Sequence, residues 1–96
     1  MALTKIKVVL ATSGALALAG CAVPPQGTTA QDVTSFEAAV ASIGCVLHTE
    51  ADYLPVELQT GLTREQTQSM AAYVLTAKRA VRLENGGVKL TTGACA

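Results

Sequence analysis

Apolar residues recur at helical spacing in the segment 36–47. The repeating face consists of Phe36, Ala39, Val40, Ile43 and Leu47. Returns of three and four residues place side chains on one side of a helix, so this segment predicts an amphipathic helix with a buried face. The sequence TSFE at 34–37 has the form of a capping box, in which Thr34 and Glu37 protect each other's backbone N–H groups. We therefore expect this helix to begin at Thr34 and to weaken at Gly44.

Two more helices are predicted further along the chain. The segment Leu54–Leu58 forms a short second helix with Pro55 in its first turn, where no backbone N–H is needed, and Gly61 ends it. The sequence TREQ at 63–66 is another capping box and opens a third helix. The apolar face of that helix is Met70, Ala71, Val74 and Leu75, with Lys78 and Arg79 near its C-terminal end, where cations are favoured.

The spacing changes to a period of two in the segment VRLENGGVKL (81–90). Apolar and polar residues alternate on both sides of Asn85-Gly86, which predicts a β-hairpin with a two-residue turn at this pair. The expected register sets three cross-strand pairs: Leu83 with Val88, Val81 with Leu90 and, on the opposite face, Arg82 with Lys89.

Three helices followed by a hairpin resemble the winged helix-turn-helix family. The segment VELQTGLTREQ (56–66) is similar to that family's turn between its second and third helices, and VRLENGGVKL is similar to its wing. The resemblance covers residues 36–90 and implies an α+β fold. It defines the fold more than the function, because one fold hosts many activities.

The beginning of the third helix departs from a surface that reads nucleic acid. It presents Thr63, Arg64, Gln66 and Thr67, and the positive charge of Arg64 is countered by Glu65. Gln68 falls where an apolar contact is usual, so the apolar spacing is off by one residue. One Phe, two Tyr and no Trp leave few rings on which bases could stack.

The N-terminal segment has the pattern of a secretory signal. Lys5 and Lys7 precede Val8–Leu18, an apolar run of about eleven residues, whereas a helix that spans a bilayer needs roughly 20. The sequence that follows, Leu18-Ala19-Gly20-Cys21, resembles the lipobox of bacterial lipoproteins. The resemblance implies cleavage before Cys21, a diacylglyceryl group on its thiol, and acylation of the new amino group by a fatty acid such as palmitate. The alternatives are a signal cut elsewhere and a chance cysteine.

A lipoprotein of this kind is anchored to the membrane without a spanning helix, because two or more acyl chains hold firmly. Ala22, in place of Asp, favours the outer membrane among Gram-negative members, with the protein facing the periplasm. Residues 1–20 are then the removed signal, and 21–33, which contain Pro24-Pro25, are a flexible tether of up to roughly 40 Å. Residues 34–96 are the folded domain.

Removal of the signal changes the charge. The full chain has seven basic and seven acidic residues, and loss of Lys5 and Lys7 leaves a formal charge of −2. Nothing in that balance attracts a polyanion.

Cys45 and Cys95 remain once Cys21 carries lipid. In an oxidising compartment an even number of cysteines indicates a disulfide, which here closes a loop of about 50 residues worth roughly 4 kcal/mol. The alternatives are free thiols or a bridge to a partner. Cys45 and His48 also resemble half of a zinc motif, to which Glu50, Asp52 and Cys95 could add ligands, but a single His makes a metal site unexpected.

No catalytic constellation stands out in the sequence. It contains no Ser–His–Asp set that can be assembled, no phosphate loop and no Cys-x-x-Cys motif, so no catalytic residue, cofactor or small-molecule substrate is expected. We expect a non-catalytic envelope lipoprotein that binds a protein partner. The candidate interaction surface consists of Arg64, Gln66, Lys78, Arg79, Arg82 and Lys89.

Other functions stay open at this point. If the chain is not exported, a winged-helix nucleic-acid-binding protein is the alternative, with Lys78, Arg79, Arg82 and Lys89 on phosphates. The same basic end could rest on anionic lipid headgroups. An inhibitor of an envelope enzyme, or a small enzyme, is the remaining alternative.

Overall fold

The computed structural model describes residues 23–96. The predicted signal segment and Cys21 of the lipobox-like sequence lie outside the described residues. The elements in chain order are α2 (Ala30–Ser42), β1 (Val46–Leu47), α3 (Glu50–Thr60), α4 (Arg64–Thr76), β2 (Ala80–Arg82), β3 (Val88–Leu90) and the 3-10 turn η1 (Gly93–Cys95). Within residues 23–96, no helix is long and apolar enough to cross a bilayer.

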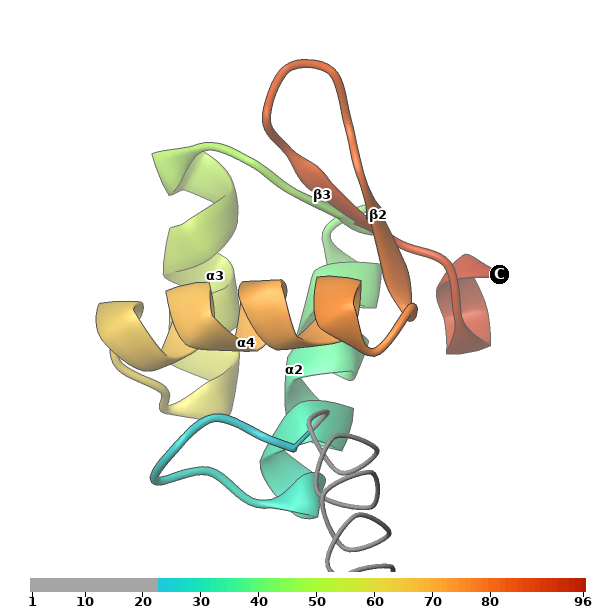
Figure 1. The fold of residues 1–96 in the computed structure, drawn as a ribbon. Coiled ribbons are helices and arrows are strands. Elements are labelled where there is room, and N and C mark those ends of the chain that lie inside the picture. The colour runs from blue at the N-terminus through green and yellow to red at the C-terminus, as the bar shows by residue number, and fades with distance from the viewer. Residues whose placement is uncertain (1–22) are drawn as a thin grey trace, which may run out of the picture.

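The fold is α+β, as predicted, with a winged-helix-like order of elements. The three helices pack together, and the hairpin of β2 and β3 projects from them as a wing (Figure 1). The antiparallel sheet has the order β1-β3-β2, so β3 is the central strand. β1 was not predicted from the sequence, because a strand of two residues is too short to show a period of two.

The first helix begins earlier than predicted. Thr29 is its N-cap: the Asp32 N–H donates to Thr29 Oγ1 at 3.2 Å, and the Thr29 N–H donates to Asp32 Oδ2 at 2.9 Å. Residues 29–32 form a capping box of their own. A helix that begins there is about one turn longer than predicted and packs the half-buried Val33 against the core. The predicted start at Thr34 is therefore wrong, and residues 30–33 of the expected tether belong to α2.

Both α2 and α4 end in the Schellman motif, with a left-handed residue just past the helix. After α2 this residue is Gly44 (φ 106°), and the Cys45 N–H donates to the Val40 carbonyl at 2.9 Å. After α4 it is Lys78 (φ 63°), and the Arg79 N–H donates to the Val74 carbonyl at 2.8 Å. Since Lys78 is not a glycine, its conformation costs about 1 kcal/mol.

The second helix is longer than predicted. It begins at Glu50 after the N-cap Thr49, so Pro55 lies in its second turn and not in its first. Asp52 accepts the N–H groups of Thr49 at 3.0 Å and of His48 at 2.9 Å, and these bonds, that of Thr49 first, lower the pKa of its carboxyl. Asp52, which precedes the predicted start of this helix, thus caps it in the first turn, where the dipole favours an acidic residue. The predicted end at Gly61 (φ 75°) is confirmed.

The predicted hairpin is present, but its register is off by one residue. The pairs are Ala80 with Leu90, Val81 with Lys89 and Arg82 with Val88. The turn is one residue longer than expected, because Leu83 pairs with Gly87 through a bond from the Leu83 N–H to the Gly87 carbonyl (2.8 Å). Gly86 takes the left-handed conformation (φ 93°) that ends a three-residue hairpin loop.

A shift of one residue exchanges the faces of a strand. Ala80, Val88 and Leu90 are buried, whereas Val81, predicted to face inward, is 48% exposed. Because β1 pairs Val46 with Lys89, the solvent side of the sheet carries one residue from each strand: Val46, Lys89 and Val81, here called the outer sheet face.

The core lies between the helices and the inner face of the sheet. Its residues are Phe36, Ala39, Val40, Leu47, Val56, Leu62, Met70, Ala71, Val74, Ala80, Val88 and Leu90. Thr67 is fully buried among them, and its hydroxyl donates to the Thr63 carbonyl at 2.8 Å. Thr67 therefore takes the position at which Gln68 seemed out of place, and the spacing of α4 is regular.

Candidate interaction surface

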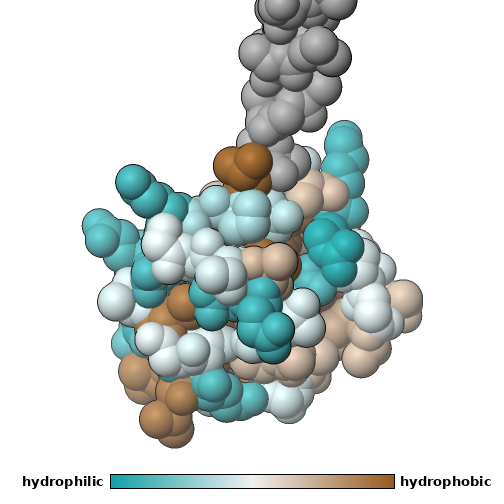
Figure 2. All heavy atoms as spheres, turned by 90° about the horizontal axis from the view of Figure 1, so that it is seen from below, coloured by the Kyte–Doolittle hydropathy of each residue, from teal (hydrophilic) through white to brown (hydrophobic). Residues whose placement is uncertain are grey.

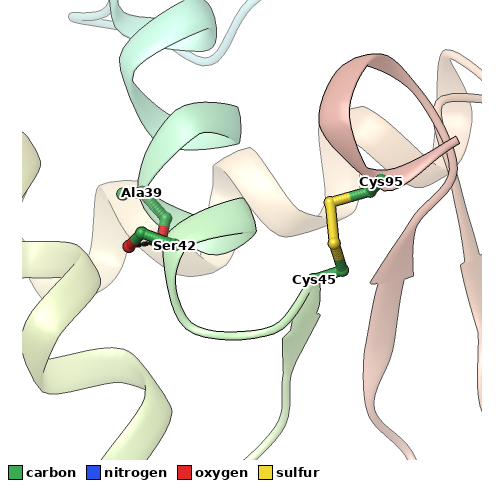
Figure 3. Close-up of a disulfide and its surroundings, with 4 residues drawn as sticks. All are labelled: Ala39, Ser42, Cys45 and Cys95. Carbon is green, nitrogen blue, oxygen red and sulfur yellow. Dashed lines mark hydrogen bonds between the residues drawn. A yellow bond between two sulfur atoms is a disulfide. The ribbon is translucent and has the colours of Figure 1, made fainter.

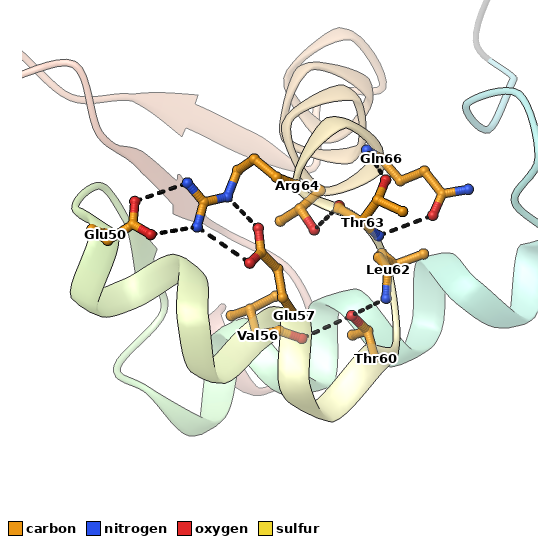
Figure 4. A network of polar contacts seen from close by, with 9 residues as sticks. Glu50, Val56, Glu57, Thr60, Leu62, Thr63, Arg64 and Gln66 are labelled. Atoms are coloured by element: carbon orange, nitrogen blue, oxygen red, sulfur yellow. Dashed lines mark hydrogen bonds and ion pairs between the residues drawn. The ribbon is translucent and has the colours of Figure 1, made fainter.

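Arg64 is the first residue of α4, and its side chain reaches toward α3, where it binds two carboxylates (Figure 4). Its Nη1 and Nη2 donate to the two oxygens of Glu50 at 2.8 Å each, and its Nε and Nη2 donate to Glu57. Its guanidinium also lies 4.9 Å from the centre of the Tyr53 ring. These partners of Arg64 were not predicted, although Glu50 and Glu57 share one face of α3 at a spacing of seven residues.

These bonds change the titration of both partners. The hydrogen bonds of Glu50, and then those of Glu57, raise the pKa of Arg64 above its usual range. In turn, the hydrogen bond from Arg64 lowers the pKa of Glu50. The one cation at the start of α4 is thus neutralised within the domain.

Gln66 serves the capping box that was predicted for α4. Its Oε1 accepts the Thr63 N–H at 3.1 Å, while the Gln66 N–H donates to Thr63 Oγ1 at 3.0 Å. Its amide also lies beside residue 27, where a Cβ placed on Gly27 would come within 3.2 Å of Gln66 Nε2. The Gln66 side chain is therefore used within the domain, in the cap of α4.

Arg79 joins the end of α4 to α2. Its Nε donates to Glu37 Oε2 at 2.5 Å and its Nη2 to Glu37 Oε1 at 2.8 Å. The hydrogen bonds of Glu37 raise the pKa of Arg79. Like Arg64, this predicted contact residue has a partner inside the domain.

The other three predicted residues, Lys78, Arg82 and Lys89, are exposed. Within residues 23–96 they form no ion pair. Lys89 lies on the outer sheet face between Val46 and Val81. Arg82 pairs with Val88 of β3, and both residues lie on the opposite face of the sheet. The six candidates therefore do not form one surface: three hold the fold together, and three lie around the sheet.

The residues that precede α2, 23–29, are here called the N-terminal segment. They form a turn in which the Thr28 N–H and hydroxyl both donate to the Pro25 carbonyl, at 3.0 and 2.5 Å. The segment lies over the solvent side of α4. A groove of about 310 Å³ separates the two, lined by Val23, Pro25 and Gln26 on one side and by Ser69, Ala72, Tyr73 and Thr76 on the other.

An adjoining groove of about 360 Å³ continues toward the start of α4. Its lining consists of Pro25, Gln26, Glu65, Gln66 and Ser69. The described part of the predicted tether is therefore not a free coil. It lies along one side of α4, the helix that a winged-helix protein would offer to nucleic acid.

The predicted disulfide between Cys45 and Cys95 is confirmed (Figure 3). The sulfur atoms are 2.13 Å apart and the Cα atoms 5.7 Å apart. Cys45 has a left-handed backbone (φ 72°), and its carbonyl accepts the Leu90 N–H at 2.9 Å. The bridge thus ties η1 to the connection between α2 and β1.

While it is bridged to Cys95, Cys45 has no thiolate to offer to the zinc motif considered from the sequence. Among the residues that the structure describes, no three His, Cys, Asp or Glu side chains lie close enough to hold a metal ion.

Comparison with known proteins gives no match to any family model, curated protein or solved structure.

Proposed function

We propose that this protein is an envelope lipoprotein, anchored by acyl chains on Cys21 at the periplasmic face of the outer membrane, that acts without catalysis by binding another envelope protein. The observation that carries the proposal is the Cys45–Cys95 bridge. The chain has three cysteines, so the bridge leaves Cys21, at the end of the lipobox-like sequence, as the one available for a lipid. A structural disulfide also suits an exported protein.

The positions of the cations support a protein partner over nucleic acid. Binding to DNA depends on cations that are free to neutralise phosphates. Arg64, at the start of α4, is instead bound to Glu50 and Glu57. The N-terminal segment also lies along the side of α4 that would face a duplex.

The partner is expected at the outer sheet face. Here Val81 and Val46 flank Lys89 in a row across the three strands, and Val81 is about half exposed. A surface of this kind suits a partner with apolar residues and a carboxylate opposite Lys89.

The anchor is tested by the intact mass of the full-length protein purified from the membranes of a Gram-negative host. We expect loss of residues 1–20, a mass gain from acyl chains, and two hydrogens fewer than the reduced chain. The Cys21→Ala variant should lack the acyl chains but keep the bridge. A full-length, unacylated protein in the cytosol would refute the proposal.

The partner is tested by crosslinking in intact cells, followed by purification in detergent. We expect one stoichiometric envelope protein, which Lys89→Glu and Val81→Asp lose and Glu65→Gln, on α4, retains. A salt-sensitive complex of the purified domain with DNA, and no protein partner, would instead favour the nucleic-acid alternative.

A further inference from the structure

We propose that one end of the domain rests on the lipid bilayer and that the wing points away from it. This inference rests on the proposed acylation of Cys21. The lipid-facing end consists of the N-terminal segment and the C-terminal half of α3, which lie at the same end of the molecule, opposite the wing (Figure 1). Its contact residues are Val23 and Leu58, and Leu54 lies one turn before Leu58 on the same face of α3.

The first argument is the length of chain between the lipid and the domain. Val23 follows Cys21 by two residues, which span at most about 7 Å when extended. The polar layer on each side of a bilayer is of the same order, roughly 5–8 Å. An acylated Cys21 therefore holds Val23 in or just above the headgroup layer.

The second argument is that the N-terminal segment is attached to the domain. Pro24 and Pro25 are half-buried, and Thr28 closes a turn on the Pro25 carbonyl. The groove against Ala72 and Tyr73 shows that the segment follows α4. The domain consequently cannot move away from the bilayer by extending a free tether.

Apolar side chains at and beside the lipid-facing end are exposed to solvent in residues 23–96. Leu58 is 86% exposed, Leu54 55% and Val23 62%. Leu54 and Leu58 are four residues apart and so lie on one face of α3. Viewed from the lipid-facing end, hydrophobic surface occurs at the base of the N-terminal segment and along the edge formed by α3 (Figure 2).

The charged residues near the lipid-facing end do not favour a contact made by basic side chains. Near the lipid-facing end, Arg64 is paired with Glu57, Asp32 is bound in its helix cap, and Glu65 is exposed. The unpaired cations described above lie at the end of α4 and on the sheet. We therefore expect an apolar contact that does not require anionic lipid, and not the contact of the basic wing with headgroups that the sequence suggested.

The chain contains no Trp, so a single introduced Trp reports its own surroundings. The mature chain from Cys21 contains every core residue, and once Cys45 and Cys95 are bridged, Cys21 can be coupled to a maleimide phospholipid in phosphatidylcholine vesicles. Leu58→Trp is the reporter of the lipid-facing end. Val81→Trp is the matched control, because it replaces another exposed apolar residue on the outer sheet face.

We expect the fluorescence of Leu58→Trp to shift to the blue and to be quenched by brominated phosphatidylcholine. Val81→Trp should show neither change, and a fraction of phosphatidylglycerol should alter neither result. The proposal is overturned if Leu58→Trp is not quenched, or if Val81→Trp is quenched as strongly. Because the lipid is attached chemically, the experiment tests the orientation apart from acylation in cells, which the intact mass tests separately.

Discussion

Arg79 holds Glu37 through two hydrogen bonds and so joins the end of α4 to the middle of α2, across 42 residues of chain. Both guanidinium bonds go to one carboxylate, which is the geometry that makes such pairs specific. The Arg79 side chain is nevertheless 42% exposed, so the pair is only partly shielded from water.

We expect Arg79→Met to lower the free energy of unfolding by about 1 kcal/mol or less, because partly exposed pairs contribute little. Urea denaturation at neutral pH measures the loss. Lys78→Met, at the neighbouring cation without an ion pair in residues 23–96, is the control and should leave the midpoint nearly unchanged. Equal losses for the two variants would show that the pair does not stabilise the domain.

Acid should weaken the contact between α3 and α4. The bonds from Arg64 hold the pKa of Glu50 below its ordinary value of 4.5, so the folded state favours the charged carboxylate. Stability from this group is present above pH 4.5 and is lost as the pH falls through the lowered pKa.

Thermal unfolding followed by circular dichroism from pH 7 down to about pH 3 tests this expectation. Glu50→Gln should flatten the dependence in the acid range, because it removes one group that binds a proton on unfolding. Glu65→Gln, at an exposed carboxylate without an ion pair in residues 23–96, should leave the slope unchanged. A slope that is the same in Glu50→Gln and in the parent would contradict the role of Glu50.

The disulfide should supply a large part of the stability. Its loop of 50 residues corresponds to about 4 kcal/mol in the chain-entropy model, and the folded part is small enough to be marginal without it. The double variant Cys45→Ser, Cys95→Ser should therefore unfold at much lower urea, and a reductant should have no further effect on it. Cys21→Ser is the matched control, and a similar loss there would contradict the assignment of the bridge.

The turn of the wing can be tested at Gly86. Gly86→Ala forces a side chain into a left-handed conformation (φ 93°) and should cost about 1 kcal/mol, although its Cβ would meet no other atom within 4 Å. Asn85→Ala should cost less, through loss of the bond from the Gly87 N–H to Asn85 Oδ1. Glu84→Ala, at the same turn, should be neutral. An unchanged midpoint in Gly86→Ala would contradict this turn.

The features predicted correctly are those that short-range signals determine. Thr63 and Gln66 lie three residues apart and cap α4 as expected, and Gly61 ends α3. Cys45 and Cys95 could be paired by counting once Cys21 was assigned to the lipobox-like sequence. Each of these signals is contained in the sequence itself and does not depend on how neighbouring elements pack.

The errors arose where two local solutions compete and packing decides between them. The sequence offers two capping boxes as starts for the first helix, and the one that begins with Thr29 adds Val33 to the packed surface. The Asn-Gly pair fits turns of two or three residues, and the pairing of β3 with both β1 and β2 selects the longer one. The acceptors of Arg64 come from another helix, so nothing beside Arg64 in the sequence indicated that this cation is neutralised.

The central position of β3 has a consequence for the order in which the domain can assemble. During synthesis, β1 and β2 emerge before the strand that lies between them. Neither edge has a hydrogen-bonding partner until residues 88–90 arrive, and oxidation of Cys45 must wait for Cys95. The helices can therefore form early, while the sheet and its covalent link close late and together.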